Sequence, residues 1–382
     1  MKDKNILIFL NLSLNDGGGI SGGDQMLIQV FKRIRKNFGE IHCFTSADGK
    51  ETVSNNVKGI KFHLTLRVFD KLPLSINYVL RTLQGFRCLF KENIDIIYGG
   101  SDFFPDVFPA FLYKIFHPKA KWVQCIFHIY PDWKMRLGNK LKNFVAQYLQ
   151  KFSLFLIKRA DIIININHQV KEELVKKGFN ERKIRVNTPG INLEYLEKLN
   201  PGNESREYEG SFIARLNPSK GIFDLIKIWK IVVSKLPEAK LAIIGGGDSK
   251  IIYRLKRNIE KENLKKNIDI LGFLKDDEAF KLIKKSKVFL FPSHEEGFGI
   301  VIAEAMACGV PVVSWNLKVY KEIFEDHSIQ VRENNFNLFS DKVIELIKDD
   351  TKREEIGAKG KIFVKKYSWD NAAERQLEFI NN

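Results

Sequence analysis

Short apolar runs alternate with longer amphipathic stretches along the chain, and this alternation limits the possible folds more than any other feature. In the first half, runs of strand type occupy residues 5–11, 40–45, 94–98, 122–127 and 161–166. Amphipathic stretches separate several of them, such as residues 23–37 and 76–91. In the second half, similar runs occupy residues 209–214, 240–245, 268–271, 288–291 and 310–314. Strands that alternate with helices predict an α/β protein with parallel sheets covered by helices.

Two alternations of this kind are separated by a turn-rich passage at residues 187–192 and a polar stretch at 200–207. A chain of 382 residues is long enough for two domains, each with its own core. The sequence therefore predicts two doubly wound, Rossmann-like domains, residues 1–190 and 191–367, that face each other across a cleft. Ligands are expected at the carboxyl ends of the strands.

A glycine-rich turn within residues 293–314 joins the last two of these runs and opens a short, apolar helix. Its backbone N–H groups and the positive end of the helix dipole suit a phosphate. Glu296 stands at the turn and Glu304 lies in the helix, where burial of a carboxylate is costly unless it is hydrogen-bonded. Two carboxylates beside a phosphate site predict a ligand such as a sugar nucleotide. Alternatively, Glu304 pairs with a buried Lys or caps a helix, and Glu296 is a solvated turn residue.

The pattern S-x-x-E-G-F-G-x-x-x-x-E-A-M-A-x-G-x-P-V-V in this run resembles the E-x7-E motif of the retaining GT-B glycosyltransferases of family 4 (group 1). That family uses nucleotide-sugar donors. The resemblance covers nearly the whole chain and implies that Glu304 binds the ribose hydroxyls and Glu296 the donor sugar. It also implies that the C-terminal helix, residues 368–382, packs back on the first domain. The donor-binding residues implied at the turn and helix start are Gly297, Phe298, Gly299 and Ile300.

Arg215 follows a predicted strand, and Lys220 comes five residues later. The Asn-Pro dipeptide between them forces a turn, so both cations can converge on one anion. Arg binds phosphate as a bidentate fork and Lys as a compact charge. This R-x4-K-G pattern resembles the diphosphate-binding clamp of the family, which would stabilise the leaving diphosphate as its charge grows. The alternative is an unrelated basic loop.

Glycines are concentrated in residues 15–25, between the first predicted strand and a helix, where they allow a phosphate or sugar to approach the backbone closely. The spacing lacks the G-x-G-x-x-G and downstream acid of a dinucleotide site. Gly22 and Gly23 best match the Gly-Gly pair of the family. The additional glycines at 17–19 leave open which amides would meet the donor, and a flexible turn is the alternative.

Further candidates come from the ends of other predicted strands. His128 resembles the family histidine that contacts the donor sugar, although a lone histidine can equally be structural. Phe273 and Leu274 resemble the edge where the family binds the nucleobase through its backbone, so UDP, GDP and ADP donors cannot be separated. Asp102 is either an acceptor-side residue or a helix cap.

The net charge of +16 is unevenly distributed, because residues 1–190 carry 30 Lys and Arg against 16 Asp and Glu. An acidic partner of the first half is therefore expected, either nucleic acid or an anionic membrane surface. No nucleic-acid-binding motif is present, so we do not expect a nucleic-acid partner. Residues 133–159 are basic, aromatic and helical in period, which suits a membrane interface. The alternative is a core-facing helix with a solvated Lys face.

The four cysteines follow no disulfide or metal spacing, which indicates a reduced, cytoplasmic setting. Asn11 ends the first apolar run before it could form a signal-peptide core, and no apolar stretch approaches the roughly 20 residues of a spanning helix. We therefore expect a cytoplasmic protein, with attachment to the inner face of the cytoplasmic membrane as an open alternative.

The resemblance and these residues together predict a retaining glycosyltransferase that moves a sugar from a nucleoside diphosphate to a hydroxyl acceptor. Arg215, Lys220, the helix start at Gly299 and the glycine loop would neutralise the diphosphate, so no metal and no cofactor besides the donor is expected. The basic first half favours a saccharide or lipid-linked acceptor of the cell envelope. The alternatives are a catalytically silent nucleotide-sugar-binding subunit, a phosphorylase on the same fold and a nucleic-acid-binding protein.

Overall fold

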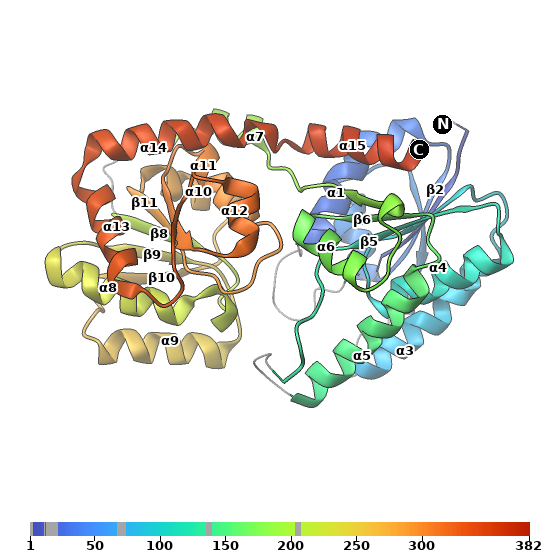
Figure 1. Ribbon diagram of the computed structural model, residues 1–382, viewed down its shortest axis with the longest axis horizontal. Helices are drawn as coiled ribbons and strands as arrows, with labels where there is room; N and C mark the ends of the chain where they lie inside the picture. The colour runs from blue at the N-terminus through green and yellow to red at the C-terminus, as the bar shows by residue number, and fades with distance from the viewer. Residues whose placement is uncertain (1–2, 11, 13–21, 67–73, 135–139, 203–207) are drawn as a thin grey trace. The chain divides into compact units, whose positions relative to one another are not determined.

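A computed structural model describes residues 3–10, 12, 22–66, 74–134, 140–202 and 208–382 (Figure 1). The chain divides into two compact units. The first comprises Met1–Pro189 and Trp369–Asn382, and the second comprises Gly190–Ser368. Each unit holds one parallel β-sheet with helices on both faces, which confirms the predicted α/β class with two doubly wound units.

The sheet of the first unit has the strand order β3-β2-β1-β4-β5-β6-β7, and all its neighbours pair in parallel. Apolar runs form the central strands because such strands are covered on both faces. The strands are β1 Ile6–Phe9, β2 Ile41–Thr45, β3 Ile60–Leu64, β4 Ile96–Gly99, β5 Lys121–Ile126, β6 Ile162–Asn165 and β7 Ile184–Val186. The apolar runs did not predict β3 and β7, which are the two edge strands.

Helices cover this sheet on both faces, and successive residues of β1 belong to different cores. Ile6 and Ile8 pack with the helices α1 and α15, whereas Leu7 and Phe9 pack with α4 and α5, as the side-chain alternation of a strand requires. The helices of this unit are α1 Gly22–Ile34, α2 Ala47–Ser54, α3 Leu74–Gly85, α4 Phe104–Phe116, α5 Lys140–Ile157, α6 His168–Lys176 and α15 Trp369–Asn381, with the short 3₁₀ turns η1 Arg35–Asn37, η3 Phe86–Phe90 and η4 Glu181–Lys183.

The C-terminal helix α15 belongs to the first unit although its sequence follows the second. It packs against α1, and Trp369 is buried in the same core as Ile6 and Ile8. Asn187 donates a hydrogen bond from Nδ2 to Gln376 Oε1 (2.8 Å), which ties the end of the first segment to this helix.

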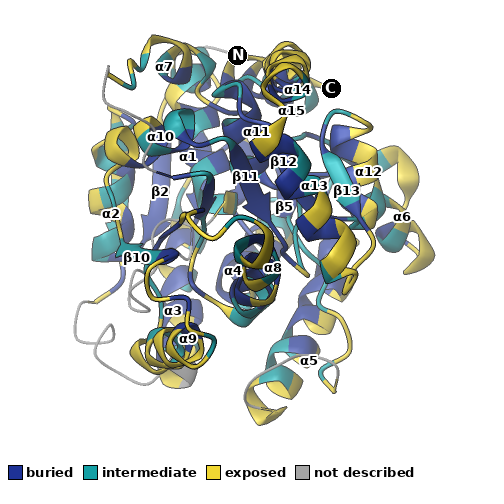
Figure 2. Ribbon diagram, turned by 90° about the vertical axis from the view of Figure 1, so that its left-hand side faces the viewer, coloured by how far each residue is buried: buried dark blue, intermediate teal, exposed yellow. Residues whose placement is uncertain are grey.

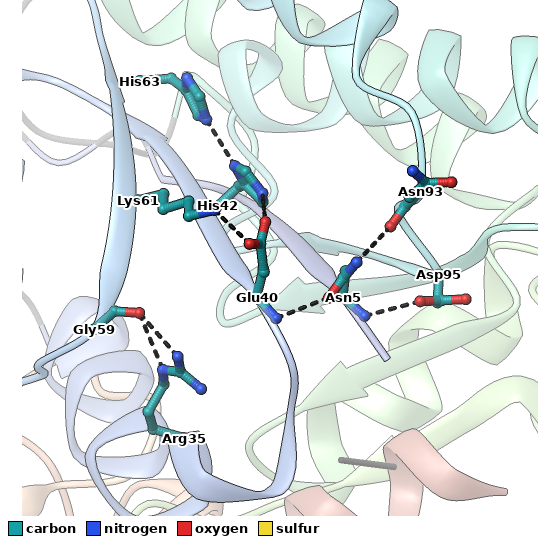
Figure 3. A network of polar contacts seen from close by, with 9 residues as sticks. All are labelled: Asn5, Arg35, Glu40, His42, Gly59, Lys61, His63, Asn93 and Asp95. Atoms are coloured by element: carbon teal, nitrogen blue, oxygen red, sulfur yellow. Dashed lines mark hydrogen bonds and ion pairs between the residues drawn. The ribbon is translucent and has the colours of Figure 1, made fainter. Parts of the chain in front are cut away.

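The amino ends of the strands in the first unit are closed by polar contacts (Figure 3). Asn5, Glu40 and Asp95 each stand one residue before β1, β2 or β4. Asn5 N donates to Asp95 Oδ2 and Glu40 N donates to Asn5 Oδ1, both at 2.8 Å. His42 Nδ1 lies 2.9 Å from His63 Nε2 across β2 and β3. The first two bonds satisfy backbone N–H groups just before β1 and β2, and the His42–His63 contact joins side chains of β2 and β3.

The sheet of the second unit has the strand order β10-β9-β8-β11-β12-β13. Its strands are β8 Gly210–Ile213, β9 Leu241–Ile244, β10 Ile268–Gly272, β11 Val288–Phe291, β12 Val312–Trp315 and β13 Ile329–Val331. Its helices are α7 Leu193–Lys198, α8 Ile222–Lys235, α9 Ser249–Lys261, α10 Asp276–Lys285, α11 Ile300–Ala307, α12 Lys318–Phe324, α13 Phe336–Lys348 and α14 Asp350–Phe363, with the 3₁₀ turns η5 Pro218–Lys220 and η6 Val364–Lys366. The order reverses between β8 and β11, and ligands bind beyond the strand ends at such switch points.

Candidate functional site

Two loops meet at the switch point of the second unit, one after β8 (residues 214–221) and one after β11 (residues 292–299). Gly221 has φ +74°, and a Cβ there would lie 1.8 Å from the carbonyl oxygen of Pro292. Only glycine therefore allows the two backbones to approach this closely. His294 N also donates to Ser219 O at 2.8 Å, so the two loops are joined by a backbone hydrogen bond.

Lys220 and Glu296 meet at this junction. Lys220 Nζ lies 2.5 Å from Glu296 Oε1 and donates to Glu295 O at 3.0 Å. The two side chains are 26% and 14% exposed, so the ion pair is partly removed from solvent. Ser293 Oγ lies 3.4 Å from the same carboxylate oxygen. The structure thus brings together a cation and an acid that lie 76 residues apart in the sequence.

Arg215 lies on the same loop as Lys220, two residues after β8 ends, and its side chain is exposed. Its guanidinium forms no hydrogen bond or ion pair with any residue that the structure describes. Because Lys220 is already paired with Glu296, Arg215 contributes an uncompensated positive charge to this loop.

The turn after β11 leads directly into α11. Gly299, at the N-cap, has φ +90°, and a Cβ there would lie 3.1 Å from Tyr320 Cε1. The first residue of the helix, Ile300, is half-buried. Phe298 is buried, with its ring centroid 5.2 Å from that of Tyr367, so its ring belongs to the core and its backbone is what remains for a ligand. Gly297 and Gly299 therefore lie where the positive end of the helix dipole meets the junction.

Glu304 lies one helical turn into α11 and is partly buried. Burial raises the pKa of this carboxyl to about 8, and the charge of Asp276 at the start of α10 adds to the effect. Within the described ranges its side chain has no hydrogen-bond or ion-pair partner, so neither a paired Lys nor a capped helix accounts for it. A carboxyl held mostly protonated at neutral pH without a partner is typical of a functional site.

A histidine that the sequence reasoning did not single out joins this site to two other elements. His294 Nε2 lies 3.0 Å from Asp224 Oδ2 on α8, and its Nδ1 lies 2.9 Å from Glu333 Oε1. The bond to Asp224 raises the pKa of His294. Burial acts to raise the pKa of Asp224, but pairing with His294 outweighs it and lowers that pKa. The place of His294 in the run between Ser293 and Glu296 was the signal available in the sequence.

Phe273 and Leu274 follow β10 at the edge of this sheet. Phe273 is 77% exposed, while Leu274 is half-buried. The preceding Gly272 has φ +71°, and its carbonyl accepts a hydrogen bond from Gly245 N (2.8 Å). Since β9 separates β10 from β8, these residues leave the sheet two strands, or about 10 Å, from the loop of Lys220.

His128, Gly22 and Gly23 lie in the first unit, at the carboxyl edge of its sheet. A Cβ on Gly23 would lie 2.7 Å from the ring of Phe127, so the start of α1 packs against the residue before His128. Gly22 is the exposed first residue of that helix. Gly23 and the segment that carries His128 therefore meet at Phe127, whereas the glycines at 17–19 lie outside the described residues.

Asp102 is buried at the same edge, two residues beyond the glycine pair that ends β4. Gln150 Nε2 on α5 donates to Asp102 Oδ2 and to His128 O, both at 2.7 Å. Burial raises the pKa of Asp102. The N-cap of α4 is Phe103, so the helix-cap interpretation of Asp102 was wrong. Gln150 instead connects Asp102 with the segment of His128.

Two family models match this chain. The model described as glycosyl transferases group 1 matches residues 200–363, and that described as glycosyltransferase family 4 matches residues 20–195. The two matched regions correspond to the second and the first unit.

Several known proteins are similar over much of their length. An uncharacterized glycosyltransferase of Methanocaldococcus jannaschii is 28% identical over 357 residues, which cover 92% of this chain and 91% of the relative. The capsular polysaccharide biosynthesis glycosyltransferase CapM of Staphylococcus aureus is 29% identical over 58% of this chain and 60% of its own. The crystal structure of Anabaena HepE in complex with UDP and glucose has a TM-score of 0.76 and 17% identity, with 99% of both chains covered.

Proposed function

We propose that this chain, a glycosyltransferase with the GT-B fold, belongs to group 1 and transfers a sugar from a nucleoside diphosphate to a hydroxyl of a saccharide or lipid-linked acceptor, with retention of anomeric configuration and without a metal ion.

One observation supports the proposed donor site most strongly. The loops after β8 and β11 bring Lys220, Glu296 and the start of α11 to one junction, and Arg215 stands on the same loop without a partner among the described side chains. Oriented N–H groups and fixed cations suit a diphosphate. The carboxyl of Glu304 has no hydrogen-bond or ion-pair partner among the described residues, so it is suited to bind the hydroxyls of a ribose.

The similar proteins support the same class of donor and acceptor. HepE of Anabaena was crystallised with UDP-glucose. The relatives include the O-antigen chain mannosyltransferase B of Escherichia coli, 24% identical over 245 residues, in addition to CapM. We propose a nucleotide-sugar donor on this basis, with an acceptor from a cell-envelope polysaccharide.

The proposed reaction depends on charge at the leaving group. As the bond from the anomeric carbon to the phosphate oxygen breaks, negative charge grows on the diphosphate, and Arg215, Lys220 and the α11 amides would stabilise it. The acceptor oxygen forms the new bond on the same face of the sugar, and its proton passes to the departing diphosphate. His128 and Glu296 would orient the donor sugar. No side-chain nucleophile and no metal is needed in this scheme.

We propose that the reaction takes place in the cytoplasm, at the inner face of the cytoplasmic membrane. In the part of the chain that the structure describes, no helix is both long and apolar enough to cross a bilayer.

A thermal-shift panel of UDP, GDP, ADP and their sugars tests the donor site and identifies the base. One nucleotide should raise the melting temperature of the wild type, and the shift should shrink in Arg215→Ala and Glu304→Ala but persist in the control Lys235→Met, which breaks a surface ion pair in the same unit. Activity that survives EDTA would support the metal-free scheme. A shift without any turnover or donor hydrolysis would identify a silent subunit, and absence of any shift would contradict the proposal.

A further inference from the structure

Helix α5 has exposed residues along its length (Figure 2), and the apolar ones among them form a stripe on one side of the helix. Leu141 is 71% exposed, Tyr148 50% and Phe155 62%. The spacing of three or four residues continues through the whole set, which is Leu141, Phe144, Val145, Tyr148, Phe152 and Phe155. The buried side of the same helix carries Gln150 and Leu154, so this stripe is a second face rather than an extension of the core.

Neighbouring elements extend this apolar surface. Helix α4 packs against both α3 and α5, and Figure 1 shows the three helices side by side. On α3, Ile76, Val79 and Leu83 recur at helical spacing and are 48%, 59% and 52% exposed. Phe90 at the end of η3 is 87% exposed. Scattered exposed apolar residues are ordinary, but α3 and α5, which both pack against α4, each carry several at helical spacing, and such groups mark an interaction surface.

The exposed charges on α3, α4 and α5 all have one sign. Residues 133–160 and residues 71–91 contain no Asp or Glu. Lys142 and Lys151 are exposed on either side of the apolar stripe of α5, and Lys158 follows the end of the helix. The acid on α4, Asp106, is buried and accepts a hydrogen bond from Ser101 Oγ. The surface is therefore apolar in its middle and positive at its margin.

We propose that α3, α4 and α5 form a docking surface for an anionic lipid bilayer. Apolar side chains flanked by lysines, with no acid between them, are the combination by which a helix binds in the interfacial plane of a charged membrane. The charge complements anionic lipid headgroups. A protein partner or a second copy of this chain would need acids of its own opposite these lysines, and α3 and α5 supply none.

Docking through α5 has a consequence for the acceptor, which rests on the proposed function. The inner face of α5 holds the segment after β5, because Gln150 Oε1 accepts from Tyr130 N at 2.8 Å and Gln147 Nε2 donates to Pro131 O at 3.2 Å. The helix that contacts lipid is thus bonded directly to the segment that carries His128. A lipid-linked acceptor would then be presented to the carboxyl edge of this sheet from the membrane.

Co-sedimentation with vesicles tests this surface. The full chain should pellet with vesicles that contain phosphatidylglycerol and much less with pure phosphatidylcholine, and salt should weaken the binding. The variant Leu141→Ser/Tyr148→Ser/Phe155→Ser should lower the partition coefficient at least about tenfold. The matched control is Tyr253→Ser/Ile362→Ser in the second unit, whose side chains are 66% and 69% exposed, and it should bind like the wild type.

The outcomes separate this surface from the donor site. Nucleotide-induced thermal shift should be the same in the triple variant and the wild type, which also shows that the variant is folded. Vesicle binding without any nucleotide shift would overturn the proposed function and support the docking surface. Equal partition of the triple variant and the wild type, or no preference for anionic lipid, would overturn the docking surface. A dimer in vesicle-free solution that the triple substitution dissociates would assign the surface to a second copy and also overturn it.

Discussion

Lys220 has a structural contact and a proposed catalytic role, and one substitution removes both. Its ammonium is bonded to the Glu296 carboxylate and the Glu295 carbonyl, and in the proposed reaction it stabilises the leaving diphosphate. Lys220→Met should lower kcat by about 10²–10³, as loss of one preorganised donor to a developing charge does. Steady-state kinetics measure this, with Lys235→Met as the control for loss of one lysine in the same unit. Near-normal kcat in Lys220→Met would remove Lys220 from the reaction.

Glu304 makes stability depend on pH in a defined direction. Its carboxyl has a pKa of about 8 in the folded protein and near 4.5 in the unfolded chain. Between these values the unfolded chain releases its proton while the folded protein keeps it, so the folded protein loses stability as pH rises. Glu304→Gln has no proton to lose, so the free energy of unfolding of this variant relative to wild type should increase from pH 5 to pH 8 and then level off.

Urea titrations at several pH values measure this difference. The same variant should bind the nucleotide more weakly, which would show that the destabilising carboxyl is kept for function. A difference in stability that is independent of pH would contradict the raised pKa.

His294 predicts a second pH effect at the same junction. The carboxylate of Asp224 holds the pKa of His294 above its ordinary value of 6.5. The stabilisation of the folded protein by this pair is therefore complete below pH 6.5 and is lost as the pH rises through the pKa of His294 in the folded protein. His294→Gln should therefore cost stability and kcat/KM at pH 6 and much less at pH 9. The cost should not add to that of Asp224→Asn, because the two side chains share one interaction. Additive effects, or a cost that does not change with pH, would contradict a positioning role for His294.

Some residues of the junction could be predicted from the sequence, and others could not. Glu296 and Glu304 could be identified because both stand in one short motif around a turn that needs glycine. The contact of Lys220 with Glu296 could be anticipated only as a shared ligand, and the structure shows a direct ion pair instead. Asp224 and Glu333 could not be found, because nothing in the sequence around either acid indicates that the fold brings it to His294.

Among secondary-structure elements, the central strands were predictable and the marginal ones were not. Each apolar run became a strand because burial on both faces demands apolar residues throughout. The missed strands β3, β7 and β13 lie at sheet edges, and the last two have three residues each. A short or half-exposed strand leaves too few apolar residues to be distinguished from a loop.

Helix α15 offers a test at this scale. Trp369 is 3% exposed and packs in the core shared with α1. Trp369→Ala should lower the free energy of unfolding of the first unit by about 3–5 kcal/mol, the usual cost of deleting a large buried side chain. Hydrogen exchange should become faster in α1 and the strands of that unit, while β8, β9 and β11 keep their protection. Slower or unchanged exchange in α1 would contradict the packing, and Tyr253→Ala, on an exposed face, is the control.

The whole molecule divides its chemistry between its two units. The second unit holds the charged junction of Arg215, Lys220, Glu296 and the start of α11, while the first holds the excess positive charge and the apolar face of α5. Composition could reveal the excess charge but not that the lysines flank an apolar stripe, since that depends on which face of α5 the core covers. Under the proposed function, substitutions in the second unit should therefore alter donor binding and those on α5 should alter membrane docking, each independently of the other.

Hydrogen–deuterium exchange of the wild-type chain with and without the nucleoside diphosphate that it binds is the most direct test of the central claim. The account predicts that protection appears in residues 214–221 and 293–304, on the loops after β8 and β11 and the first turn of α11. Protection confined to other strand ends of the second unit, or none at all under conditions where the donor is consumed, would contradict the assignment of the diphosphate to this junction.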